Sequence, residues 1–168
     1  MTPRMPVIFA LLAALSAGMM PARADSLLET AGLIETVRIQ PEAIDIRAKV
    51  DTGAENSSVD TRDWETFERE GATWIRFTLR LDNGGRRTLE RPLHRMAEIH
   101  RAGSTQNRPV VLMTLCVGAV AREVEVNLSE RPKLTYRMLL GASFLTGAYV
   151  VDVSQSDLTR PACGETVK

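Results

Sequence analysis

The sequence has no excess of charge of either sign. Its 168 residues include 21 basic and 21 acidic side chains. Two of the basic residues, Arg4 and Arg23, lie in the first 24 residues, so the rest of the chain has 19 basic and 21 acidic residues and a net charge of −2. This balance predicts no basic surface for nucleic acid, and we expect no nucleic-acid partner.

Motifs for metals and nucleotides are also missing. The two histidines, His94 and His100, are six residues apart, and neither lies in a His-Glu-x-x-His motif. Zinc is usually held by three or four Cys, His or carboxylate ligands. The chain has no Gly-rich loop ending in Lys-Ser/Thr for ATP and no Gly-x-Ser-x-Gly turn for a serine nucleophile. We therefore expect no metal and no cofactor.

Long apolar runs are confined to the start of the chain. Arg4 gives a basic beginning, and the apolar run Val7 to Met20 precedes Ala22-Arg23-Ala24, which fits a cleavage site. A membrane anchor is the alternative, but the run is shorter than the roughly 20 residues that a span needs. We expect residues 1–24 to be a signal peptide removed before Asp25. The mature protein is then periplasmic or secreted, without stable membrane insertion.

The chain has only two cysteines, Cys116 and Cys163. In an exported protein such a pair can form a disulfide. Alternatively, Cys116 is a buried free thiol within an apolar strand and Cys163 lies in a loose tail. The sequence leaves both interpretations open.

Most of the remaining chain alternates between apolar and polar residues, as half-buried strands do. Asn83-Gly84-Gly85 separates two such runs and predicts a tight hairpin turn. Residues 63–70 are charged and favour a short surface helix or a loop, and residues 142–147 favour one helical turn. Beyond Leu158 the chain is polar, and we expect it to be mobile. The expected strands are 33–39, 44–50, 73–81, 87–90, 92–100, 109–116, 121–128, 134–140 and 148–153.

This pattern of strands with at most one or two short helices predicts an all-β fold, either a small barrel or a sandwich. The sequence has no internal repeat, low-complexity tract or linker. We therefore expect one domain, residues 25–168, with a core of about residues 33–158. Its length is enough to bury a substantial core.

One stretch points to chemistry. The strand from Ile44 to Val50 runs directly into Asp51-Thr52-Gly53-Ala54. Gly53 lets the backbone bend sharply, and Thr52 offers a hydrogen-bond donor next to the acid. An acid held in this way at the end of a buried strand is suited to catalysis, although it could also simply cap a turn.

Asp51-Thr52-Gly53-Ala54 resembles the active-site motif of aspartic proteases. The longer run Ala48 to Ala54 resembles the bacterial retropepsin-like aspartic endopeptidase family, once labelled "ATP-dependent zinc protease". A second match follows near the end, where Tyr136 to Gly141 precedes Tyr149-Val150-Val151-Asp152. The resemblance implies a small closed barrel of the single-lobe retropepsin type.

The resemblance also implies a mechanism. Aspartic proteases place two carboxylates so close together that they share a proton, and the pair activates a water molecule. This chain has a single Asp-Thr-Gly and about half the length of two-lobed enzymes. The second carboxylate is then Asp51 of another copy, in a homodimer.

The family's functional residues map onto three segments. Asp51, Thr52 and Gly53 form the catalytic turn. Hairpin residues 101–107 are expected to cover the substrate as a flap, with the Asn83-Gly84 hairpin as the competing candidate. The expected substrate-binding residues are Ala54, Glu55, Asn56, Ala102, Gly103 and Ser104, and the expected active-site supports are Leu139, Leu140 and Gly141.

The sequence departs from the family at three positions. Relatives commonly have Asp-Thr-Gly-Ala-Arg-Thr-Ser, whereas this chain has Glu55 and Asn56, and it has Ala142 where relatives often carry an arginine. We expect an exported aspartic endopeptidase that acts on a peptide or protein substrate. The alternative is a non-catalytic, peptide-binding β-barrel of the cell envelope that keeps the same fold.

Overall fold

The computed structural model describes residues 28–101, 104–131 and 135–164. The expected leader, residues 1–24, lies outside the described residues. No helix in these described ranges is long and apolar enough to cross a membrane. The elements are β1 (Glu29–Gly32), β2 (Ile34–Gln40), β3 (Ile44–Asp51), β4 (Ser57–Arg69), β5 (Ala72–Arg80), β6 (Arg86–Pro92), β7 (Arg95–Arg101), β8 (Ser104–Val117), β9 (Val120–Ser129), β10 (Met138–Gly141), α1 (Ala142–Leu145) and β11 (Tyr149–Asp152).

Six strands close into a barrel in the order β10-β3-β2-β8-β9-β4, and β4 pairs with β10 to complete the ring. The pairs β10–β3 and β4–β9 are parallel, and the other pairs in the ring are antiparallel. Closure removes the open sheet edges that would otherwise invite further strand pairing. The predicted all-β closed barrel, with one short helix among the described residues, is confirmed.

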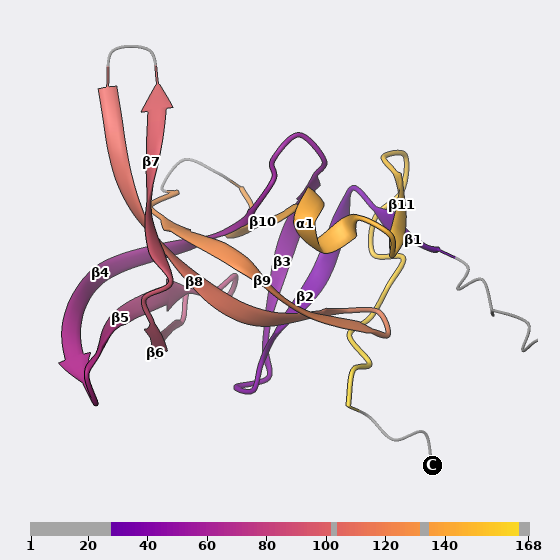
Figure 1. Cartoon of the computed structure of the whole chain (residues 1–168). Coiled ribbons are helices and arrows are strands. Elements are labelled where there is room, and N and C mark those ends of the chain that lie inside the picture. Colours follow the sequence, from indigo (N-terminus) through magenta and orange to yellow (C-terminus); the bar gives the residue numbers. More distant parts are fainter. Residues whose placement is uncertain (1–27, 102–103, 132–134, 165–168) are drawn as a thin grey trace, which may run out of the picture.

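Two strands continue beyond the barrel and carry further hairpins (Figure 1). The second half of β4 pairs with β5, which pairs with β6. The first half of β8 pairs with β7, and this β7–β8 hairpin projects away from the barrel in Figure 1. The predicted hairpin turn at Asn83-Gly84-Gly85 is confirmed, because it joins β5 to β6 and Gly84 has a φ of 79°.

The prediction of a helix or loop at residues 63–70 is wrong. β4 continues to Arg69 and pairs with β5, with an irregularity between Arg62 and Glu65. Two of the charged residues here form ion pairs across strands, Glu65 with Arg76 at 2.6 Å and Arg69 with Glu90 at 2.5 Å. These side chains are largely solvent-exposed, as on a surface helix, but they lie on a strand, where opposite charges facing each other across the sheet stabilise strand pairing.

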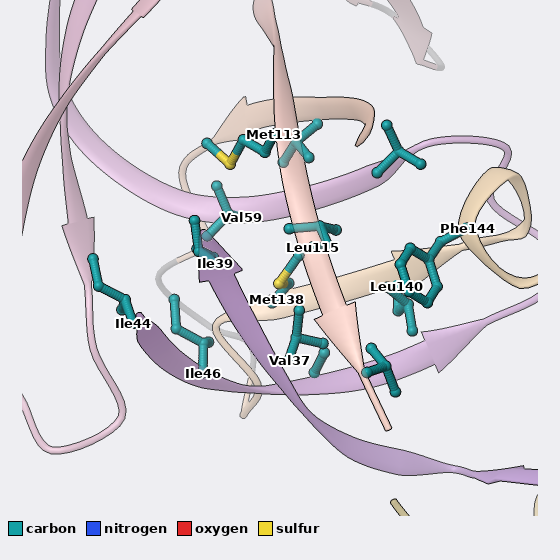
Figure 2. Close-up of a cluster of buried hydrophobic side chains, with 14 of the residues drawn as sticks. Val37, Ile39, Ile44, Ile46, Val59, Met113, Leu115, Met138, Leu140 and Phe144 are labelled. Atoms are coloured by element: carbon teal, nitrogen blue, oxygen red, sulfur yellow. The ribbon is translucent and has the colours of Figure 1, made fainter. Parts of the chain in front are cut away.

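The barrel interior is filled by the apolar residues of the alternating strands. Every second residue is buried along β3 and, from Glu35 onward, along β2, because successive side chains of a strand point to opposite faces. Burying each such side chain contributes about 1.5–3 kcal/mol relative to leaving it exposed. Figure 2 shows side chains from β2, β3, β4, β8, β10 and α1 meeting in this core: Val37, Ile39, Ile44, Ile46, Val59, Met113, Leu115, Met138, Leu140 and Phe144.

The segment after β11 is held against the barrel, so the expectation of a mobile tail beyond Leu158 is wrong for residues 159–163, while residues 165–168 lie outside the described residues. We call residues 153–163 the C-terminal strap. The buried Glu35 carboxylate accepts hydrogen bonds from the backbone amides of Leu158 (3.1 Å) and Thr159 (3.0 Å). A disulfide joins Cys163 to Cys116 in β8. Composition cannot reveal such a tether, because its acceptor lies more than 120 residues away.

Candidate active site

Asp51 is the last residue of β3 and lies partly exposed where the buried strand leaves the barrel. Its side-chain Oδ1 accepts a hydrogen bond from the Gly53 amide at 3.2 Å, and its carbonyl accepts one from the Ala54 amide at 3.2 Å. These two bonds close a tight turn around the acid. The turn fixes the carboxylate at the end of a rigid strand, while Thr52 and Gly53 stay exposed.

Gly141 supports this turn from the neighbouring strand. It is the parallel partner of Asp51 in the β10–β3 pair. A Cβ atom at Gly141 would lie 2.6 Å from the Asn56 carbonyl carbon and 2.8 Å from the Glu55 oxygen, so only glycine fits. The Gly141 amide also donates to the Ser57 hydroxyl at 3.1 Å. The loop after the Asp-Thr-Gly turn therefore lies directly against β10.

The other two residues of this segment have different surroundings. Leu140 is buried in the core, and Leu139 is only partly buried and lines a pocket next to Asp51. Directly after Gly141, the first amides of α1 donate to the loop: Ala142 to the Ala54 carbonyl at 2.8 Å, and Ser143 to the Glu55 carbonyl at 2.9 Å. The Leu-Leu-Gly segment thus contacts the core, the pocket and the Asp-Thr-Gly turn.

The pocket next to Asp51 has a volume of about 320 Å³. Asp51 is the only carboxylate among its lining residues. Two cations line it as well, Lys49 and Arg131, neither of which the sequence had singled out as a site residue. No ion pair to Lys49 or Arg131 occurs within the described residues. The lining residues are Lys49, Asp51, Arg131, Thr135, Tyr136 and Leu139.

Arg131 is held in place by hydrogen bonds, and its guanidinium forms no ion pair among the described residues. Its guanidinium Nη1 donates to the Ser58 hydroxyl, and its amide donates to the buried Asp60 carboxylate at 2.8 Å. The side chain of Asp60 is in turn paired with Arg137 at 2.8 Å. Burial lowers the pKa of Arg131, as does the nearby positive charge of Arg108, but a guanidinium remains protonated. The pocket therefore has a net positive lining.

No sequence signal pointed to Arg131, because the loop that carries it has no motif or periodicity. Only the fold brings it from the end of β9 to the end of β3. Metal chemistry has no corresponding support in the parts of the chain that the structure describes, since no three His, Cys, Asp or Glu side chains gather around a common point there.

The expected substrate-binding residues fall into two groups. Ala54, Glu55 and Asn56 line a second pocket of about 340 Å³ together with Arg95, Ala97, Glu98 and Asn127. No residue of the Asn83-Gly84-Gly85 turn lines it, so of the two candidate flaps the β7–β8 hairpin is the one adjoining this loop. Ala102 and Gly103, at the tip of that hairpin, lie outside the described residues. Ser104 begins β8.

A closed single-chain barrel with an Asp-Thr-Gly turn at the end of a buried strand, braced by a Leu-Leu-Gly segment, defines the single-lobe aspartic-protease class. Residues 30–161 match the model of the RimB-like family, described as "Retropepsin-like aspartic endopeptidase RimB". The chain therefore belongs to the RimB-like family, which confirms the family expected from the sequence.

Curated relatives are longer proteins. A probable alpha-L-glutamate ligase of Shewanella pealeana is 32% identical over 115 residues, which make up 66% of this chain and 25% of that protein. A probable alpha-L-glutamate ligase of Desulfotalea psychrophila is 32% identical over 114 residues, 64% of this chain and 24% of that protein. The chain thus spans about a quarter of the length of these relatives.

A solved structure has a similar fold. It is a protein of unknown function from Legionella pneumophila, with a TM-score of 0.69 and 26% sequence identity. The similarity covers 79% of this chain and 98% of that protein. The barrel and its extensions are therefore close to the whole of that structure.

Proposed function

We propose that this protein is an aspartic endopeptidase in which Asp51 and Asp51 of a second copy together activate a water molecule. The observation that carries the proposal is the position of Asp51, fixed on the Asp-Thr-Gly turn by the Gly53 amide and facing a pocket. Membership of a retropepsin-like family supports the same activity. One carboxylate takes the proton of the attacking water while the other, protonated, donates to the carbonyl oxygen of the peptide bond.

A homodimer follows from this chemistry. The pocket of a single chain holds one carboxylate, and the reaction needs two that share a proton. Thr52 is exposed beside Asp51. In a dimer related by a two-fold axis, its hydroxyl can donate a hydrogen bond to the second copy. The two Asp51 residues then titrate as one coupled pair.

The positive pocket lining supports an acidic peptide as substrate. Lys49 and Arg131 line the same pocket as Asp51, and neither forms an ion pair within the described part of the chain. An acidic side chain next to the scissile bond would satisfy both cations. The relatives named alpha-L-glutamate ligases are consistent with a glutamate-rich peptide, although the chain corresponds to only a quarter of their length.

The disulfide between Cys116 and Cys163 supports an exported protein, periplasmic or secreted, because disulfides persist mainly in oxidising compartments. The basic start, apolar run and Ala-Arg-Ala site of the first 24 residues point the same way.

The test is hydrolysis of glutamate-containing peptides at acidic pH by the wild type and by Asp51→Asn. We expect the variant to lose at least about 10³-fold in kcat, as the loss of a reacting group does. Asp63→Asn is the matched control, because Asp63 lies on the β4 extension outside the pocket and its positive φ suits asparagine equally well. Equal activity of Asp51→Asn and wild type would refute the proposal.

A non-catalytic peptide-binding barrel is the second candidate. It is favoured by the single carboxylate in the pocket of one chain and by the departures from the family at Glu55, Asn56 and Ala142. The mass of the mature protein in solution separates the two. A monomer that binds an acidic peptide without cleaving it supports the binder, whereas a dimer that cleaves the peptide supports the protease.

A further inference from the structure

Glu125, on β9, accepts hydrogen bonds from two sides of the candidate active site. On one side the Asn56 side-chain amide donates to Oε2 at 2.7 Å. On the other side Arg95 donates from Nε to Oε1 at 3.0 Å and from Nη2 to Oε2. The His94 Nε2 lies 3.2 Å from Oε1. One carboxylate therefore gathers donors from two separate segments of the chain.

These two segments are the ones that a substrate is expected to contact. Asn56 belongs to the loop that follows the catalytic turn, whose carbonyls at Ala54 and Glu55 hold the first amides of α1. Arg95 is the first residue of β7, at the base of the hairpin that projects from the barrel (Figure 1). Both segments line the same pocket of about 340 Å³.

Glu125 itself stands on a fixed part of the barrel. Its strand β9 pairs with β8 on one side, where Leu112 is its partner, and with β4 on the other. Among residues 54–56 and 94–98, no other hydrogen bond or ion pair joins the loop to the base of the hairpin. The contact between them therefore runs through this one side chain.

We propose that Glu125 is a positioning residue that couples the catalytic turn to the β7–β8 hairpin, an inference that rests on the proposed function. When a peptide occupies the pocket between them, contact with the hairpin base fixes Arg95. The carboxylate transmits this constraint to Asn56 and so to the loop that follows Asp51. The two parallel hydrogen bonds of a bidentate arginine–carboxylate pair are strong and fix the relative orientation of the two groups.

The side-chain amide of Asn56 is long enough to reach Oε2 of Glu125 at 2.7 Å. A purely structural ion pair at this partly exposed position would alter stability only slightly when removed. The change in stability is therefore expected to be small for either role, and a kinetic effect is what separates a positioning role from a structural one.

The experiment compares Glu125→Ala and Glu125→Gln with Glu123→Ala. Glu123 is the matched control, because it lies two residues away on the same face of β9, is exposed, and forms no ion pair or side-chain hydrogen bond with any other described residue. We expect Glu125→Ala to lower kcat/KM on the order of ten- to a hundredfold, as displaced active-site groups do, with a melting temperature close to that of Glu123→Ala. Glu125→Gln keeps an acceptor for Asn56 but loses the charge facing Arg95, and it should show mainly a raised KM.

Single variants of Asn56 and Arg95, the two partners of Glu125, separate its expected effect on kcat from its effect on KM. Asn56→Ala should lower kcat, because it frees the catalytic loop, and Arg95→Ala should raise KM, because it frees the hairpin base. Glu125→Ala should show both changes, and adding it to the Asn56→Ala/Arg95→Ala double variant should change nothing further. If Glu125→Ala is as active as Glu123→Ala, the coupling is refuted.

Hydrogen exchange tests the coupling without any catalysis. In Glu125→Ala the amides of Ala142 and Ser143, which report on the 54–56 loop, and those of β7 should exchange faster, and in Glu123→Ala they should not. If both glutamate variants exchange alike, the inference fails, whatever the activity. If Asp51→Asn retains wild-type activity but the exchange difference is present, the proposed function fails and the coupling stands.

Discussion

The disulfide between Cys116 and Cys163 should contribute a large part of the stability of this domain, and Cys163→Ala tests this. The bond links residues 47 positions apart, so it restricts the unfolded chain considerably. In the loop-entropy account a loop of this length corresponds to about 4 kcal/mol at 25 °C. For a chain of this size each kcal/mol shifts the melting temperature by about 3 °C, so the variant should melt about 12 °C below the wild type.

The C-terminal strap also has noncovalent anchors. They hold it in the native state, so loss of the disulfide should act mainly by increasing the entropy of the unfolded state. Glu35 still receives the amides of Leu158 and Thr159 and the Thr159 hydroxyl at 2.9 Å, so the native strap can stay in place without the bond. We therefore expect Cys163→Ala to keep its native fold and its activity while losing stability.

The assay is thermal unfolding followed by circular dichroism, with and without a thiol reductant. The wild type should drop to the melting temperature of Cys163→Ala when reductant is added, and the variant itself should not respond. A fall of less than about 3 °C in the variant would refute the loop-closure reasoning, since it would correspond to only about 1 kcal/mol.

Three further predictions concern the site. Gly141→Ala forces a Cβ into the backbone of residues 55–56, so it should destabilise the fold by about 1–3 kcal/mol in urea unfolding and reduce activity; a wild-type midpoint would contradict this. Arg131→Gln should lower kcat/KM about tenfold for an acidic peptide and leave a neutral peptide of the same length nearly unchanged, and equal losses would contradict a positive pocket. The Arg95 hydrogen bonds hold the pKa of Glu125 below its usual 4.5, so Glu125 contributes stability above pH 4.5 that is lost as the pH falls through its lowered pKa. The difference in melting temperature between wild type and Glu125→Gln should therefore be largest above pH 4.5 and shrink below it, and a difference that grows on acidification would contradict this sign.

Much of the barrel could be predicted from the sequence because its strands obey a local rule. β3 alternates buried and exposed residues from Ile44 to Val50, and the Asn83-Gly84-Gly85 turn carries its own backbone preference. The strand at residues 63–69 could not be predicted in this way, since most of its residues are exposed and show no burial alternation, and only the pairing with β5 fixes it as a strand.

The candidate site likewise has parts that follow from local sequence motifs and parts that depend on long-range contacts. The Asp-Thr-Gly turn and the Leu-Leu-Gly segment were found because each is a contiguous motif. Arg131 and Glu125 were missed because each acts on a residue far away in the chain: Arg131 bonds Ser58, and Glu125 bonds Asn56. Neither long-range contact leaves a trace in local composition.

The sequence by itself determined which residues alternate into strands and where the acid lies, at Asp51 on a glycine bend, because backbone preference and side-chain period are properties of neighbouring residues. Only the tertiary structure decided which cations surround that acid, which glutamate connects Asn56 to Arg95, and that the polar strap is fastened to Glu35. These depend on where the strands of a closed barrel bring distant side chains together, which their pairing sets and the order of residues along the chain does not display.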